Sequence, residues 1–141
     1  MPDWNQVIAT CEAELPEVER STSYGTPALK VRGKLFCRLR EDEEQIVVFC
    51  DFMEREALIQ SDPATFQVTP HYQDWPMVLI TLAAVADDEL FELLVESWRR
   101  RAPKRVLAAY DEASRIAQVQ TALAAEEPPE AAVLDGIRHP A

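Results

Sequence analysis

The stretch that decides the fold is Ala28–Leu39, ALKVRGKLFCRL. Apolar and polar residues alternate along it, which is typical of strands with one buried face. The alternation pauses at Arg32-Gly33-Lys34, where Gly33 suits the left-handed position of a three-residue hairpin loop. The pattern therefore predicts two antiparallel strands. Their apolar face consists of Leu29, Val31, Leu35, Cys37 and Leu39, and the other face presents Lys30, Phe36, Arg38 and Arg40.

The segments around this hairpin predict the rest of the sheet and the helices that cover it. Asp3 is an N-cap candidate with Gln6 three residues later, and apolar residues then recur at a helical period up to Leu15. The run IVVFC at 46–50 is apolar throughout, as in a central strand buried on both faces. We expect further strands over 65–69 and 77–82, and helices over 51–60, 87–101 and 104–125. This order predicts an α+β sandwich in which helices pack on one face of an antiparallel sheet.

The length of 141 residues suits one domain. We expect residues 1–125 to form that domain. Residues 126–141 contain Pro128, Pro129, Gly136 and Pro140 with little periodicity, so we expect a flexible C-terminal tail. No apolar run has the length of a membrane span, and the first residues lack a secretory signal pattern. These features predict a cytoplasmic protein with no membrane partner.

Residue types that carry catalysis or bind metals are scarce. Cys11, Cys37 and Cys50 have no CxxC spacing, which excludes a disulfide framework and a four-cysteine zinc site. The chain has two histidines, His71 and His139, and three glycines, too few for a multi-histidine metal site or a phosphate-binding glycine loop. We therefore expect no enzyme activity, no catalytic residue, no cofactor and no metal.

Two basic clusters are the positive findings in a chain of net charge −11. The hairpin cluster comprises Lys30, Arg32, Lys34, Phe36 and Arg38, and the helix-end cluster comprises Arg99, Arg100, Arg101, Lys104 and Arg105. Cations with an aromatic residue on a two-stranded ribbon suit phosphate contact and stacking. The alternative is structural: the cations balance nearby acids, and Phe36 packs under a helix. The net charge opposes binding to a polyanion such as DNA.

A third candidate is the aromatic loop at residues 70–76, which contains His71, Tyr72 and Trp75 between prolines. Aromatic side chains are common anchors for protein partners and for small ligands. This loop indicates an alternative function as a protein interaction module or a small-ligand binder.

Several motifs resemble those of the MmcQ/YjbR-like family of small bacterial proteins, in consistent order over residues 4–112. The matching positions are Tyr24, Gly25, Pro27, Val31, Gly33, Lys34, Phe36, Trp98 and Pro103. The resemblance implies a fold like that of the frataxin homologue CyaY, with two helices packed on an antiparallel sheet. It also implies a DNA-binding role without catalytic residues or a cofactor.

The arrangement of the two basic clusters separates the hypotheses. DNA binding predicts that both clusters lie on one continuous basic surface. A module for another partner predicts that the cations are separated and paired locally with acids.

Overall fold

A computed structural model describes the backbone of residues 2–137 and the side chains of residues 2–125. The chain divides into two units, one ending at Pro103 and one beginning at Lys104. The first contains helices α1 (Trp4–Glu14), α2 (Phe52–Ser61) and α3 (Asp87–Arg101) and strands β1 (Val18–Ser23), β2 (Thr26–Val31), β3 (Lys34–Leu39), β4 (Gln45–Phe49), β5 (Phe66–Gln67) and β6 (Met77–Thr81). The second is the helix α4 (Lys104–Ile137).

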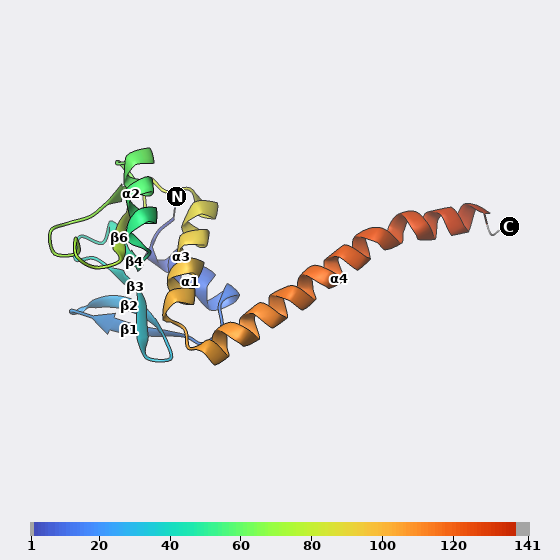
Figure 1. Ribbon diagram of the computed structural model, residues 1–141, viewed down its shortest axis with the longest axis horizontal. Helices are drawn as coiled ribbons and strands as arrows, with labels where there is room; N and C mark the ends of the chain where they lie inside the picture. Colours follow the sequence, from blue (N-terminus) through green and yellow to red (C-terminus); the bar gives the residue numbers. More distant parts are fainter. Residues whose placement is uncertain (1, 138–141) are drawn as a thin grey trace. The chain divides into compact units, whose positions relative to one another are not determined.

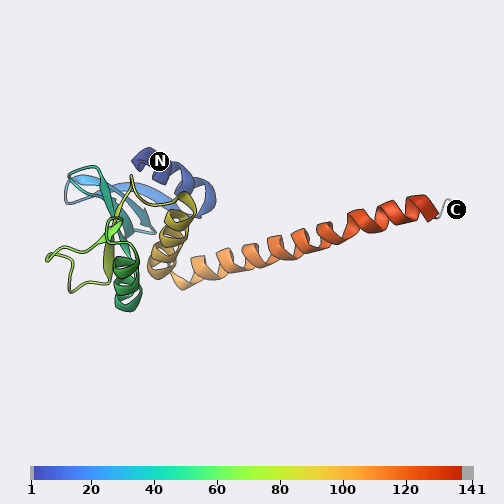
Figure 2. The same ribbon diagram turned by 90° about the horizontal axis from the view of Figure 1, so that it is seen from above.

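The six strands form one antiparallel sheet in the order β1-β2-β3-β4-β6-β5. Helices α1 and α3 cover one face of the sheet, and the loop between β5 and β6 lies on the opposite side (Figures 1 and 2). We call the side with α1 and α3 the helix face and the other the loop face. The expected α+β class is thus confirmed.

Strand register assigns the buried side chains to these two faces. One row across the sheet joins Leu29, Cys37, Val48 and Val78, all fully buried. The adjacent row joins Ala28, Arg38, Val47 and Leu79. Val47 and Leu79 form a cluster with Tyr72 of the β5–β6 loop, which places this second row on the loop face. Strand β4 is therefore buried on both faces, as its apolar run predicts.

The ends of the helices follow the capping residues in the sequence. The Asp3 carboxylate accepts a hydrogen bond from the Gln6 backbone N–H at 2.9 Å, and Asp51 caps α2 through Glu54 in the same way at 2.7 Å. Helix α3 has acidic residues in its first turn and arginines in its last, an arrangement that suits the helix dipole.

Two features of the sheet differ from the predictions. The segment Val18–Ser23, which we did not expect to form a strand, is the edge strand β1. The hairpin turn is shorter than expected, with Val31 paired to Lys34, and the β2–β3 register then shifts so that Lys30 faces Leu35 but Leu29 faces Cys37. This bulge leaves Phe36 without a partner and breaks the expected alternation. Phe36 and Arg38, which the alternation places on the face opposite the apolar side chains, are 0% and 4% exposed.

Helix α4 differs from the predicted helix in its end point. The predicted end at Ala125 is wrong, because the backbone stays helical to Ile137. Alanine and glutamate around Pro128 and Pro129 favour the helix, while each proline removes one N–H donor. The flexibility expected of residues 126–141 stays a prediction, and its last residues, 138–141, lie outside the described part of the chain. No helix in the described residues is long and apolar enough to span a membrane.

The β3–β4 ladder ends at the Cys37–Val48 pair. Beyond it, Ser97 of α3 forms hydrogen bonds with the next backbone groups of both strands. The Ser97 hydroxyl donates to the Phe36 carbonyl and accepts from the Phe49 N–H at 2.9 Å. Ser97 is completely buried. One helix side chain thus satisfies two backbone groups that the strands leave unpaired.

Replacing Ser97 with alanine should therefore destabilise the fold. The change leaves a buried carbonyl and a buried N–H without partners, which costs about 1–3 kcal/mol. Urea unfolding followed by far-UV circular dichroism measures this loss. The control is Ser61→Ala, since the exposed Ser61 hydroxyl bonds only the Leu58 carbonyl of its own helix. Equal stability of the two variants would contradict the role assigned to Ser97.

Candidate functional site

A pocket of about 330 Å³ opens on the loop face of the sheet. Its lining residues come from the β1–β2 turn, from strands β3, β4 and β6, from the β5–β6 loop and from the end of α3. They are Tyr24, Leu35, Arg38, Phe49, His71, Tyr72, Trp75, Met77 and Arg101. None of these described lining residues is acidic. The volume lies in the range of small-ligand sites.

Arg38 is held at the pocket by a dense set of hydrogen bonds. Its Nη1 donates to the Tyr72 hydroxyl at 2.6 Å, and its Nε donates to Thr26 Oγ1 at 3.2 Å. Its Nη2 donates to Glu41 at 2.7 Å, and the guanidinium carbon lies 5.4 Å from the centre of the Tyr24 ring. The pKa of Glu41 lies below its ordinary value, first because of a bond from its own backbone N–H and then because of Arg38. One buried cation thus joins the sheet, the turn and the aromatic loop.

Arg101 supplies the second guanidinium. Its Nε donates to the Leu35 carbonyl at 2.8 Å, and its guanidinium carbon lies 4.4 Å from the centre of the Phe49 ring. Arg101 follows Ser97 by one helical turn, so the gap that Ser97 bridges is also where Arg101 reaches the pocket. Within the described residues no carboxylate forms an ion pair with Arg101.

Arg55 of α2 fixes the aromatic wall of the pocket. Its Nη1 donates to the carbonyls of Tyr72, Trp75 and Met77 at 3.4, 2.8 and 3.1 Å, and its Nη2 donates to Gln73 at 2.9 Å. Arg55 is only 6% exposed. Because one rigid guanidinium binds three carbonyls of the loop and the carbonyl of Met77 at the start of β6, the loop has a defined shape without regular secondary structure.

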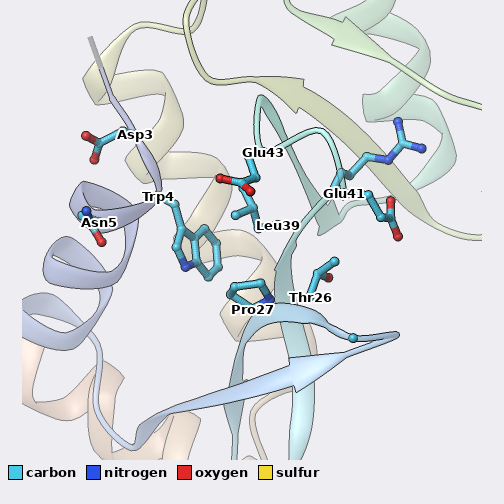
Figure 3. Close-up of a pocket in the computed structure, with 10 residues that line it drawn as sticks. Asp3, Trp4, Asn5, Thr26, Pro27, Leu39, Glu41 and Glu43 are labelled. Carbon is cyan, nitrogen blue, oxygen red and sulfur yellow. The ribbon is translucent and has the colours of Figure 1, made fainter.

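A second pocket of about 480 Å³ lies between the start of α1 and the β3–β4 loop (Figure 3). Its lining includes Asp3, Glu41 and Glu43, and the indole of Trp4 projects toward Pro27. Asp3 and Glu41 are already engaged by the Gln6 N–H and by Arg38. No group of three or more potential metal ligands exists among the described residues. The acidic lining makes this pocket a poor site for an anion.

The predicted hairpin cluster is not a free basic surface. Arg32 pairs with Glu17 at 3.3 Å, and Lys30 lies opposite Glu19 in the β1–β2 register. The Glu19 carboxylate also accepts from the Gly33 N–H at 3.1 Å. Lys34 is exposed, whereas Phe36 and Arg38 are buried, so the Phe36 ring cannot stack on a base. Glu17, just before β1, and Glu19, on this strand that the sequence did not predict, therefore offset the cations beside them.

The predicted helix-end cluster is also divided. Arg100 is exposed, Arg99 is half-buried, and Arg101 turns to the loop-face pocket. Lys104 and Arg105 are exposed residues of α4, in the second unit. The cations of the two clusters therefore differ in exposure and in partners.

The aromatic loop does assemble a site. His71, Tyr72 and Trp75 all line the loop-face pocket, and the rings of His71 and Tyr72 meet edge to face at 4.7 Å. Trp75 is 60% exposed, and Tyr24 across the pocket is 79% exposed. The second candidate histidine, His139, lies outside the described residues. The site expected from the sequence does not include Tyr24 or Phe49, although Tyr24 is among the positions that match the MmcQ/YjbR-like family.

The three cysteines are buried free thiols. Burial raises the pKa of Cys11 and of Cys50 to about 12, and it raises the pKa of Cys37 well above its ordinary value. These residues are therefore neutral thiols at physiological pH, as expected for small apolar core residues.

Comparison with known proteins identifies the family. The family model described as YjbR matches residues 13–100, more than half of the chain. The chain belongs to the YjbR family. All lining residues of the loop-face pocket except Arg101 fall within this matched YjbR segment.

The individual relatives are similar to this YjbR-family chain over different extents. Uncharacterized proteins Rv2570 and MT2646 of Mycobacterium tuberculosis and Mb2600 of Mycobacterium bovis are each 39% identical over 54 residues. That match covers 38% of this chain and 42% of each relative, so the chain spans less than half the length of these proteins. The crystal structure of Deinococcus radiodurans protein DR2400, of domain family DUF419, has a TM-score of 0.64 at 20% identity. It covers 79% of this chain and 89% of its own, which shows a shared fold.

Removing the guanidinium of Arg55 should destabilise the first unit and loosen the aromatic loop. In Arg55→Met, four carbonyls lose a charged donor, and each such bond contributes about 1.5–3 kcal/mol. We expect a clear fall in the urea midpoint and faster amide hydrogen exchange at residues 72–77. The control Arg20→Met removes an exposed ion pair with Glu12 and should leave both readouts nearly unchanged. Unaltered exchange in Arg55→Met would show that the loop holds its shape without this residue.

The cysteines should resist thiol reagents in the folded protein. Dithionitrobenzoate reacts with thiolates, and burial both shields these sulfurs and keeps them protonated. We expect no rapid release of the coloured product from native protein and reaction of all three cysteines in denaturant. A stoichiometric reaction under native conditions would contradict the burial.

Proposed function

We propose that this protein is a non-enzymatic binding module that takes a small organic anion in the loop-face pocket. The observation that carries the proposal is the composition of the pocket lining in a chain of net charge −11. Its described lining contains Arg38, Arg101 and His71 but no acidic residue. A pocket lined by cations and by no acidic residue, in a protein this acidic, has a local electrostatic field that attracts anions.

The aromatic lining supports an organic rather than an inorganic anion. Tyr24, Phe49, Tyr72 and Trp75 contribute apolar ring surface next to the guanidinium groups. Sites of this kind bind small molecules through apolar contact and orient them through a few polar groups. The aromatic loop would also suit a protein partner, but the concave shape of the pocket favours a small ligand over a flat protein surface.

Duplex DNA binding, the role implied by the family resemblance, has weaker support in the geometry. Arg32 is paired with Glu17, Glu19 lies opposite Lys30, and Arg38 is buried. Arg32 and Arg38 are thus paired with acids nearby, which is the arrangement expected of a module for another partner. Duplex DNA binding is therefore the alternative hypothesis, and the experiment tests it in a separate titration.

The test compares two fluorescent dyes that differ by one charge. Anilinonaphthalene sulfonate is an aromatic anion, and N-phenylnaphthylamine is its uncharged parent. We expect saturable binding of one sulfonate dye per chain, weakened about tenfold or more in Arg101→Gln because a charge-assisted contact is lost. The control Lys34→Gln, at the exposed hairpin turn, should bind the dye like the unmodified protein. The uncharged dye should bind the unmodified protein and both variants with the same affinity.

The second arm titrates a labelled mixed-sequence duplex at about 50 and 200 mM salt, followed by fluorescence anisotropy. We expect no saturable binding. Duplex binding that falls steeply with salt and weakens in Lys34→Gln, without dye binding at the pocket, would replace the proposal with DNA binding through the hairpin.

A further inference from the structure

The charge balance of the loop-face pocket limits the charge of its ligand. Arg38 is offset by Glu41, whose carboxylate lies 2.7 Å from Nη2. Arg101 has no such partner in the described part of the chain. Of the two arginines in the pocket, Arg101 is therefore the one whose positive charge no described carboxylate compensates. A monoanion balances it, whereas a dianion leaves a negative charge near Glu41.

Arg101 is oriented to bind a planar acid group. The Leu35 carbonyl accepts from Nε at 2.8 Å, and the Phe49 ring lies against the guanidinium. These two contacts restrain the plane of the group and leave the terminal nitrogens of Arg101 without a hydrogen bond to any described residue. Paired N–H donors of a guanidinium match the two oxygens of a carboxylate.

The pocket rim indicates a flat body for the ligand. Tyr24 is 79% exposed and Trp75 is 60% exposed, although both line a pocket whose arginines are largely covered. Large aromatic rings held in the open next to a cation offer stacking surface to a planar group. The loop bearing Trp75 is fixed by Arg55, so this surface exists before any ligand arrives.

We propose that the ligand is an aromatic monocarboxylate, with its carboxylate on Arg101 and its ring against Tyr24 and Trp75. This inference rests on the proposed function and narrows it to one ligand class. Glu41 acts within it as the charge that keeps Arg38 from accepting a second negative group.

The experiment is isothermal titration of the full chain with three naphthalene probes at pH 8. Naphthoate carries one negative charge, naphthamide is its neutral isostere, and naphthyl phosphate is a dianion. We expect naphthoate to bind one per chain and about tenfold tighter than either of the others. In Glu41→Gln, where Arg38 also becomes uncompensated, naphthyl phosphate should gain about tenfold relative to naphthoate.

Two variants separate the acid contact from the ring contact. Arg101→Lys keeps the charge but loses the paired donors, and it should reduce the preference for naphthoate over naphthamide by about tenfold. Trp75→Ala, at an exposed position, should weaken both probes equally. The control Arg20→Gln changes an exposed cation outside the pocket and should alter neither. Far-UV circular dichroism confirms that each variant is folded.

Equal binding of naphthoate and naphthamide, or tighter binding of naphthyl phosphate by the unmodified protein, would overturn the ligand class. Sulfonate dye binding that depends on Arg101, without binding of any naphthalene probe, would overturn the class and leave the proposed function standing. Failure of the dye and of all three probes would overturn both.

Discussion

The arrangement of the loop-face pocket depends on the place where strands β3 and β4 part. Their ladder ends at Cys37–Val48, and the buried Ser97 hydroxyl then bonds Phe36 and Phe49 in place of a strand partner. Arg101, one turn later on α3, passes into the space between them and contacts Leu35 and Phe49. A helix that covers one face of the sheet thus contributes a cation to the pocket on the other.

Much of the fold follows from local sequence signals. Asp3 and Asp51 mark helix starts, the acidic and basic ends of α3 mark its boundaries, and the apolar run of β4 indicates burial on both faces. The polar edge strand β1 carries no such signal, because its position in the sheet comes from pairing with β2. The bulge at Phe36 is also a tertiary effect, since the register depends on a partner strand and on Ser97.

The candidate site was only partly predictable for the same reason. His71, Tyr72 and Trp75 are close in sequence, and they do meet in one pocket. The roles of Arg38 and Arg101 could not be inferred, because a cation's availability depends on which acids the fold places beside it. Glu19 lies on β1, a strand the sequence did not reveal, and Glu17 lies in the turn just before it. These two acids offset the hairpin cations that looked most suited to phosphate. Arg101, in contrast, has only carbonyl and ring contacts among the described residues.

The contacts of Arg55 have a consequence for how the pocket responds to its surroundings. The loop is held by a guanidinium on four carbonyl oxygens, so none of the four acceptors is a carboxylate that acid would protonate. Buried contacts of this kind are also only weakly screened by salt. The aromatic wall should therefore keep its shape in acid and in concentrated salt, conditions that weaken the exposed ion pairs elsewhere on the molecule. The shape of the wall is kept because the acceptors around the Arg55 guanidinium are uncharged carbonyl oxygens.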